Sequence, residues 1–162
     1  MVTAVWTKGL PEAAARIRTE VFVQEQGFER EFDEKDRDAY HIVLLKDGEP
    51  AATGRIFPGQ APAVWLAGRI AVRGSERGSG LGSALMREIE AKAKALGAGC
   101  MEISAQTRAR PFYEKQGYRA EGEEYLDEYC PHICMRKTLY NFGKMLGNSA
   151  KKDCACGHNM IK

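Results

Sequence analysis

The chain has 162 residues, of which 44% are hydrophobic and 28% charged, and its formal net charge is +2. This length suits one domain whose core needs no disulfide or metal, and the small charge without a basic stripe argues against nucleic acid as a partner. No apolar run approaches the roughly 18 residues of a membrane span, and the N-terminus has no signal-peptide pattern, so we expect a cytoplasmic protein.

The first half of the chain has the periodicity of a strand, a helix and a hairpin. Proline is favoured in the first turn of a helix and glycine at its end, and an Asp-Gly pair between two apolar runs is a strong hairpin signal. The expected elements are a strand at 2–7, a helix opened by Leu10 and Pro11 and ended by Gly27, an acidic loop at 29–38, and strands at 41–46 and 51–58.

The second half alternates strands with helices. The apolar run at 64–72 alternates poorly between apolar and polar residues, as a strand covered on both faces does. The expected elements are a strand at 64–72, a helix from Leu81 to Gly97, a strand at 101–105, a short helix at 110–116, and two final strands between Tyr118 and about Leu139. Strands that alternate with helices around a strong central strand predict an α/β fold with a mixed sheet.

A glycine-rich segment, RGSERGSGLGSALM at 73–86, joins the strand at 64–72 to the next helix. Such a turn is typical of a phosphate site, because unpaired backbone N–H groups and the positive end of the helix dipole point at one spot. It is not a P-loop, because no lysine follows Gly82, and it lacks the G-x-G-x-x-G spacing of dinucleotide-binding proteins. The alternative is a tight turn that binds nothing.

The hexapeptide Arg77 to Gly82 resembles the R/Q-x-x-G-x-G/A signature of the GNAT superfamily of N-acetyltransferases. The segment SAQTRARPFYEKQGYRA at 104–120 resembles the second signature of that family, in the same order and at a similar spacing. VFVQEQGF, EFDEKD, AYHIVL, GRIAV and LDEYCPHICM are similar to the ElaA-like branch, so the resemblance covers about residues 10–139.

This resemblance implies a GNAT-like fold, with a central six- to seven-stranded mixed sheet that is flanked by helices and splayed between its fourth and fifth strands. It implies one acetyltransferase domain at 1–140, followed by a C-terminal extension at 141–162 whose flexibility is left open. It also implies that acetyl-CoA is the co-substrate and that an acetyl group moves directly to a primary amine through a tetrahedral intermediate.

The resemblance further implies where acetyl-CoA binds. Backbone groups of Ile70 and Val72, in the strand at 66–72, take the pantetheine arm, and the loop amides take the pyrophosphate. The implied site residues are Ile70, Ala71, Val72, Arg77, Gly78, Ser79, Gly80, Leu81, Gly82, Ser83, Arg108 and Phe112. We expect Arg73 to be a solvated surface charge, and solvation is also the alternative for Arg108 and Arg110.

Tyr113 matches the position of the family's catalytic tyrosine, four residues before Gly117. A phenol, with a pKa of about 10, suits a proton donor to a departing thiolate. The alternative is a packing role on the short helix. His132 is the preferred base or relay for the amine proton, with Glu102 next.

Other polar residues of the resembling segments are weaker candidates for the base, because most polar side chains are solvated or satisfy structural hydrogen bonds. They are Glu25, Gln26, Asp33, Glu34, Asp36 and His41.

Five cysteines, an odd number, favour free thiols over a disulfide framework. Cys130-x-His132-x-Cys134 could join Cys154-x-Cys156-x-His158 in a structural zinc site, but we favour adventitious thiols in a mobile tail and predict no metal.

Three functions are therefore weighed: an acetyltransferase, a non-catalytic acyl-CoA-binding regulatory module, and a thiol- or metal-binding protein. Tyr113 together with the glycine-rich loop favours the enzyme. We expect a small-molecule or peptide amine as acceptor, no nucleic-acid or membrane partner, and a monomer or homodimer.

Overall fold

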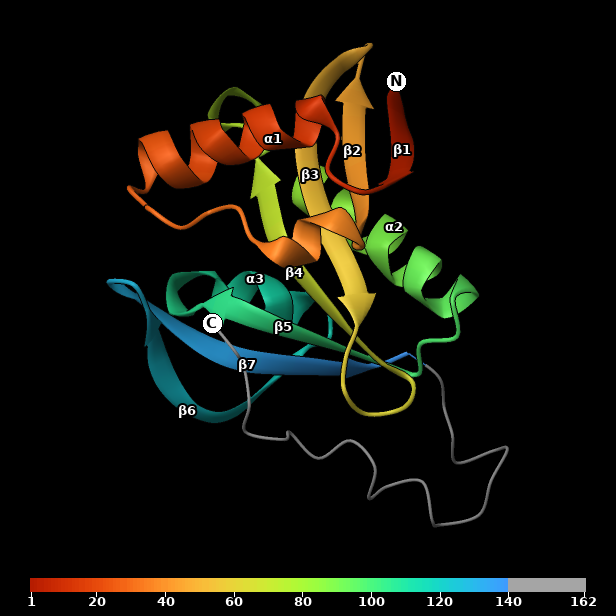
Figure 1. Cartoon of the computed structure of the whole chain (residues 1–162), viewed down its shortest axis with the longest axis vertical. Coiled ribbons are helices and arrows are strands. Elements are labelled where there is room, and N and C mark those ends of the chain that lie inside the picture. Colours follow the sequence, from red (N-terminus) through yellow and green to blue (C-terminus); the bar gives the residue numbers. More distant parts are fainter. Residues whose placement is uncertain (140–162) are drawn as a thin grey trace. The chain divides into compact units, whose positions relative to one another are not determined.

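The computed structural model describes residues 1–139 (Figure 1). Within them the chain forms two compact units. The first contains Met1–Phe57 and Ala67–Ala93, and the second contains Pro58–Leu66 and the described residues from Lys94 onward.

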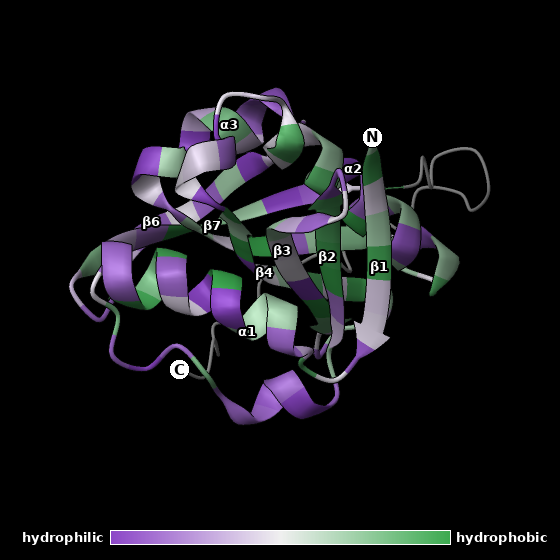
Figure 2. Cartoon of the chain, turned by 90° about the horizontal axis from the view of Figure 1, so that it is seen from above, coloured by the Kyte–Doolittle hydropathy of each residue, from purple (hydrophilic) through white to green (hydrophobic). Residues whose placement is uncertain are grey.

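The first unit is built on an antiparallel arrangement of β1 (Val2–Lys8), β2 (Tyr40–Lys46) and β3 (Glu49–Pro58). Figures 1 and 2 show α1 (Glu12–Arg18) and α2 (Leu81–Ala95) on opposite faces of these strands. In Figure 2, β2 is mostly green and α1 alternates between green and purple, as expected for a central strand and for a helix with one face on the core. The most buried apolar side chains of this unit include Ala14, Ile17, Ile42, Leu44, Ala52, Ile56, Leu85, Met86 and Ile89.

Gly54 lies where β3 meets α2. A Cβ atom added to Gly54 would lie 2.9 Å from Cδ1 of Ile89, closer than real Cβ atoms come to a neighbour. The side chain of Ile89, in the middle of α2, therefore packs directly on the backbone of β3 at Gly54.

The predicted first helix is present, but it changes its hydrogen bonding midway. After α1 the chain continues as a π-helix, η1 (Thr19–Glu25), and Gly27, at φ +76°, follows its end as predicted. The acidic segment after it is a loop, as expected, with one additional turn of 3-10 helix, η2 (Glu34–Arg37). Asp33 caps this turn by accepting a hydrogen bond from the Lys35 amide, a local contact that the sequence analysis did not consider.

β4 (Val64–Val72) has the predicted bounds. The expected cover on both faces is only partly correct, because Val64, Ala67 and Ala71 are buried whereas the other residues of the strand are half-buried.

The second unit contains three antiparallel strands and a short helix. β7 (Cys130–Thr138) pairs with β5 (Cys100–Gln106) on one side and with β6 (Arg119–Asp127) on the other. The 3-10 helix η4 (Thr107–Ala109) and α3 (Arg110–Lys115) follow β5. Its buried side chains include Met101, Ile103, Ala105, Tyr118, Ile133 and Met135.

The strand order is β1-β2-β3-β4-β5-β7-β6, which confirms the predicted mixed α/β fold and gives seven strands in residues 1–139. The predicted splay between the fourth and fifth strands stays a prediction. No helix among the described residues is long and apolar enough to cross a membrane.

Candidate active site

The glycine-rich loop leaves β4 through one short 3-10 helix, η3 (Gly74–Glu76), and enters α2 at the predicted residue, Leu81. Gly78 and Gly80 have φ values of +81° and +82°, a backbone conformation that L side chains rarely adopt. A Cβ atom at either position would meet no heavy atom within 4 Å. Backbone conformation, rather than crowding, therefore requires glycine here, and the loop presents bare backbone in front of α2.

The start of α2 suits a phosphate group. The amide of Ala84 donates to the carbonyl of Gly80 at 3.1 Å, so the N–H groups of residues 81–83 lie in the first turn, ahead of the regular helical bonds. This first turn contains no acidic residue. The positive end of the helix dipole is therefore not opposed by a local carboxylate, which is the arrangement that favours an anion.

Arg77 is fixed at the base of this loop. Its Nη2 lies 2.7 Å from Oε2 of Glu25, and its Nε donates to the carbonyl of Val72 at 3.0 Å. The side chain is still 49% exposed, so it remains accessible from solvent. Glu25, considered as a base from the sequence, acts here as the partner of Arg77.

Arg73 lies at the surface with its side chain 39% exposed, but it also has partners that its prediction as a solvated charge did not include. Its Nε lies 2.9 Å from Oε2 of Glu20, and its Nη1 donates to the carbonyl of Pro50 at 3.3 Å. Arg73 therefore ties the end of β4 to η1 and to the start of β3.

In the second unit, α3 buries Tyr113 against aromatic neighbours. The rings of Phe112 and Tyr118 meet the Tyr113 ring edge to face, with centroids 5.1 Å and 6.0 Å away. Burial raises the pKa of the Tyr113 phenol, so the hydroxyl stays protonated throughout the physiological pH range. Tyr113 is thus kept in the form that can donate a proton, although the same burial is what a packing role would give.

His132 lies in a polar row on β5, β6 and β7. Its Nδ1 is 2.9 Å from the carbonyl oxygen of Cys130, and its ring stacks on Tyr125, whose hydroxyl is hydrogen-bonded to the hydroxyl of Ser104. Because a carbonyl can only accept, Nδ1 of His132 carries the proton when the ring is neutral, and Nε2 then has the lone pair. This tautomer is the one that can act as a base through Nε2.

Glu102 is less available for proton transfer. Its Oε1 lies 3.3 Å from Nη2 of Arg136 and accepts from the thiol of Cys134 at 3.4 Å. Arg136 is buried and stands directly across from Glu102 in the β5–β7 register. The carboxylate therefore balances a buried cation, a role that favours His132 over Glu102 as the base.

The two arginines expected near the nucleotide are exposed and make local contacts. Arg108 Nε donates to the side chain of Gln106 at 2.9 Å, and Arg110 pairs with Glu114 one helical turn later at 2.5 Å. Both are consistent with the solvated alternative, and a site for the nucleotide at Arg108 stays a prediction.

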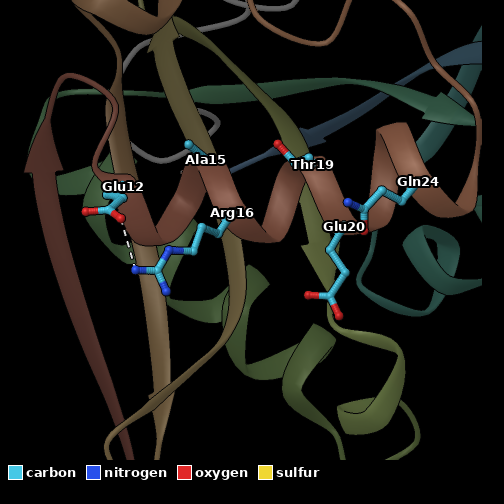
Figure 3. A pocket seen from close by; sticks show the side chains of 6 residues that line it. All are labelled: Glu12, Ala15, Arg16, Thr19, Glu20 and Gln24. Atoms are coloured by element: carbon cyan, nitrogen blue, oxygen red, sulfur yellow. Dashed lines mark hydrogen bonds and ion pairs between the residues drawn. The ribbon is translucent and has the colours of Figure 1, made fainter.

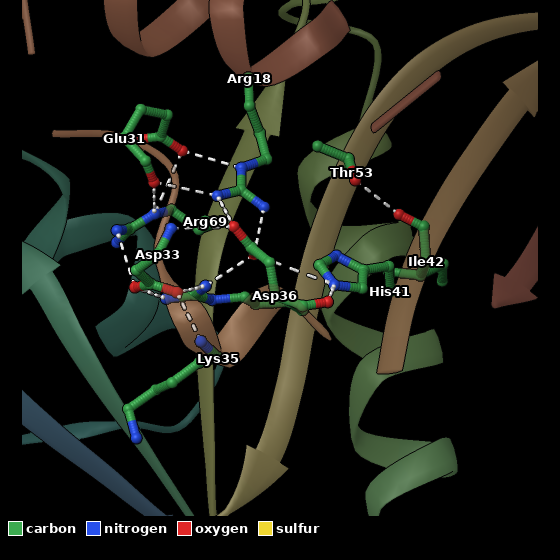
Figure 4. A network of polar contacts seen from close by, with 10 residues as sticks. Arg18, Glu31, Asp33, Lys35, Asp36, His41, Ile42, Thr53 and Arg69 are labelled. Atoms are coloured by element: carbon green, nitrogen blue, oxygen red, sulfur yellow. Dashed lines mark hydrogen bonds and ion pairs between the residues drawn. The ribbon is translucent and has the colours of Figure 1, made fainter. Parts of the chain in front are cut away.

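A group of charges in the first unit, four of them buried, is the feature that the sequence did not reveal (Figure 4). We call it the ionic cluster, and its members are Arg18, Glu31, Asp33, Asp36, Arg55 and Arg69. Arg18 lies within hydrogen-bonding distance of Glu31 at 2.8 Å and of Asp36 at 2.7 Å. Arg55 holds both oxygens of Asp33, at 2.6 Å and 2.8 Å, and also contacts Asp36 at 2.7 Å.

Burial and the neighbouring arginines act in opposite directions on the pKa values of the carboxyl groups in this cluster. Burial by itself raises the pKa of Asp36, but hydrogen bonds and charge from Arg18, with Arg55, outweigh it and lower that pKa to about 2. At Glu31, burial outweighs the nearby arginines and raises the pKa. His41 donates through Nε2 to the carbonyl of Asp36 at 3.0 Å, and burial lowers its pKa, so the ring is neutral. The candidates Asp33, Asp36 and His41 therefore have structural partners in this cluster.

The remaining sequence candidates do not gather into a metal site. Among residues 1–139, no group of three His, Cys, Asp or Glu side chains is placed to hold a metal ion. Cys100, Cys130 and Cys134 are free thiols, whereas Cys154, Cys156 and His158 lie outside the described residues. Gln26 and Glu34 are not members of the ionic cluster.

A shallow depression on α1 and η1 contains none of the predicted site residues (Figure 3). Its lining residues all come from one side of this continuous helix, and they are Glu12, Ala15, Arg16, Thr19, Glu20 and Gln24. Glu12 and Arg16 pair with each other across its edge at 2.9 Å.

Comparison with known proteins shows the family of this chain. The family model described as "Acetyltransferase (GNAT) domain" matches residues 9–139. The uncharacterised N-acetyltransferase YjcF of Bacillus subtilis (strain 168) is 39% identical over 124 residues, which cover 75% of this chain and 87% of YjcF. The chain is therefore an acyltransferase of the GNAT family.

Solved structures give the same result. A crystal structure from Lactobacillus plantarum, described provisionally as an N-acetyltransferase, aligns with a TM-score of 0.78 and 34% identity over 86% of this chain and 99% of that chain. Escherichia coli ElaA aligns with a TM-score of 0.76 and 26% identity over 85% of this chain and 99% of ElaA. The family uses acyl-CoA and acts on small-molecule or peptide acceptors, which sets the class of reaction for this chain.

Proposed function

We propose that this protein is an acetyl-CoA-dependent N-acetyltransferase that moves an acetyl group directly to the primary amine of a small molecule or peptide. The observation that carries the proposal is the left-handed turn at Gly78 and Gly80 in front of α2, which suits the pyrophosphate of coenzyme A. We retain the prediction that residues 1–140 act as one catalytic domain.

The reaction needs one base and one acid. The amine nitrogen attacks the thioester carbonyl, the new C–N bond forms, and the C–S bond of the tetrahedral intermediate then breaks. The amine loses a proton to Nε2 of His132, and the departing thiolate takes a proton from the hydroxyl of Tyr113. An alkyl ammonium with a pKa near 10.4 costs about 4–5 kcal/mol to deprotonate at pH 7, which is why a base is expected.

Tyr113→Phe tests the acid. The substitution keeps the ring against Phe112 and Tyr118 and removes only the hydroxyl, so kcat should fall by roughly 10²–10⁴-fold while the Kd for coenzyme A changes little. Single-turnover release of thiol and calorimetry give the two quantities. Tyr118→Phe is the matched control, because it removes a phenol hydroxyl from the same aromatic group, and it should keep near wild-type kcat.

Near-full turnover by Tyr113→Phe, with chemistry shown to be rate-limiting, would remove Tyr113 from the mechanism and leave it a packing residue. His132→Gln should also lower kcat. If only Glu102→Gln lowers kcat, the base assignment passes to Glu102.

Gly80→Asp tests the donor site. The new side chain forces a strained backbone at φ +82° and sets a carboxylate where the pyrophosphate is expected, so calorimetry should show a large loss of affinity for coenzyme A. Unchanged affinity would rule out this loop as the site.

An activity assay distinguishes the proposed enzyme from the alternative, a non-catalytic acyl-CoA-binding module. A panel of polyamines, aminoglycosides, lysine and peptide N-termini, assayed with acetyl-CoA by released thiol, should show turnover with at least one amine. Tight binding of acetyl-CoA without acetylation of any amine would favour the binding module.

A further inference from the structure

Arg69 has an unusual backbone for a residue inside a strand. Four residues other than glycine have positive φ among residues 1–139: Asp47, Ala63, Arg69 and Glu128. Three of them lie in the connections that precede or join strands, whereas Arg69, at φ +52°, lies within β4. A left-handed conformation is unfavourable for an L residue with a side chain, so something must hold Arg69 in it.

The ionic cluster holds the side chain of Arg69. Its Nε lies 3.1 Å from both the carbonyl oxygen and Oε1 of Glu31, and its Nη2 lies 3.4 Å from Oδ2 of Asp33. Figure 4 shows Arg69 among these acidic residues. Glu31 is itself held by Arg18, which places its Nε and Nη2 on the side chain and the carbonyl of Glu31.

The next residues along the chain are those expected to carry the pantetheine arm. Ile70, Ala71 and Val72 follow Arg69 directly and lead into the glycine-rich loop. In a strand, successive peptide groups alternate in direction, so a left-handed residue changes the direction in which the following N–H and C=O groups point. The conformation of Arg69 therefore sets what these three residues can offer to a ligand.

We propose that Arg69 is a positioning residue for the acyl donor: the ionic cluster, through Glu31 and Asp33, holds β4 in the left-handed bend from which residues 70–72 present their backbone to acyl-CoA. This inference rests on the proposed function, because it takes acyl-CoA as the ligand of β4. It gives the cluster a role in donor binding beyond stability.

Arg73 provides a comparison within the same segment. It flanks residues 70–72 on the other side, and its guanidinium likewise contacts a carboxylate, that of Glu20, and a carbonyl, that of Pro50, although Arg69 contacts two carboxylates. Its φ of −56° and ψ of 141° are ordinary for an L residue. Arg69 and Arg73 therefore differ in backbone conformation more than in the type of their contacts.

The test replaces Arg69 with alanine and with glycine. Alanine loses the guanidinium and disfavours φ +52°, so β4 relaxes and the Kd for coenzyme A should rise about tenfold or more. Glycine loses the same contacts but adopts positive φ readily, so its Kd should lie between those of Arg69→Ala and the wild type. Calorimetry is done well below the unfolding midpoint of each variant, so that loss of folded protein does not enter the Kd.

Arg73→Ala and Arg73→Gly are the matched controls. At an ordinary φ, glycine gives no relief of strain and weakens a strand or turn relative to alanine. Arg73→Gly should therefore bind coenzyme A no better than Arg73→Ala. If glycine binds coenzyme A more tightly than alanine at position 69 but not at position 73, the backbone conformation of Arg69 matters for binding. A merely structural role of Arg69 would not produce this difference.

Two results overturn the inference. One is an unchanged Kd in Arg69→Ala while Gly80→Asp abolishes binding, which would leave the proposed function intact. The other is a Kd in Arg69→Gly as weak as that in Arg69→Ala. If neither variant folds, Glu31→Gln is the deciding variant. It weakens the contact of Glu31 with Arg69, so the Kd for coenzyme A should rise. An unchanged Kd would contradict the inference. A wild type that does not bind coenzyme A at all marks instead a failure of the proposed function.

Discussion

The glycine-rich loop and the ionic cluster lie in the same unit and are built in opposite ways. The loop is a contiguous, exposed segment defined by backbone conformation, with Gly78 and Gly80 at positive φ and open space around them. The cluster joins residues from 18 to 69 through side chains of which four are buried, those of Arg18, Glu31, Asp36 and Arg55. The loop is therefore suited to meet a ligand, and the cluster is suited to hold the strand that leads into the loop.

Buried charges of this kind are costly unless each has its partners. Removing one partner of a buried pair leaves an uncompensated charge, which costs more than the pair contributes when intact. Substitutions in the loop should accordingly change ligand binding with little effect on stability, and substitutions in the cluster should change stability strongly. The following predictions test that contrast.

The largest effect on stability is expected from Asp36→Asn. Asp36 accepts from Arg18 and Arg55 with its side chain 8% exposed, so the substitution leaves two buried guanidinium groups without this carboxylate. The free energy of unfolding should fall by about 3–5 kcal/mol, measured by denaturant titration. Asp47→Asn is the control, because Asp47 pairs with the N-terminal amine at the exposed surface, and it should leave stability nearly unchanged. Equal effects of the two substitutions would contradict the contrast.

Acid should weaken the wild type through the same carboxylate. The pKa of Asp36 is lowered from 3.8 to about 2 in the folded protein, so its contribution is present above pH 3.8 and is lost as the pH falls from about 4 to 2. This contribution is about 2 kcal/mol. Glu31, whose pKa is raised, acts in the opposite sense, since its contribution is present below its unfolded pKa of 4.5 and is lost as the pH rises.

The difference in stability between wild type and Asp36→Asn isolates the Asp36 contribution. This difference should shrink between pH 4 and pH 2 in denaturant titrations at constant ionic strength. A difference that stays constant over this range would show that the charge of Asp36 is not what stabilises the fold.

The smallest effect is expected from Gly80→Ala. No atom obstructs a Cβ at Gly80, so the cost comes only from placing alanine at φ +82° and should be about 1 kcal/mol. Gly68→Ala is the control: this glycine in β4 also has open space around it but no positive φ, and alanine there should stabilise the protein by about 0.4–1 kcal/mol. If the free energy of unfolding changed in the same direction in both variants, the backbone conformation of the loop would not be the reason for its glycines.

The turn at Gly78 and Gly80, the start of α2 at Leu81 and the bounds of β4 could be predicted from the sequence, because each depends on neighbours along the chain. Glycine supplies positive φ whatever surrounds it, and a helix N-terminus exposes its amides by its own geometry. These local rules, together with the resemblance to the GNAT family, were enough to predict the class of enzyme, which the family match confirms, and to propose the donor loop.

Only the tertiary structure decided the roles of the charged side chains. From the sequence, Asp33, Asp36 and Glu102 were candidate bases, and Arg73 was a solvated charge. Whether a charge is free or paired depends on which distant residues the fold brings within about 3 Å, and on how much water the fold removes around them. Composition and spacing give neither the distances between residues far apart in the sequence nor their exposure to water. The pairing of Arg69 with Glu31 and the positive φ of Arg69 could therefore be seen only in the folded structure.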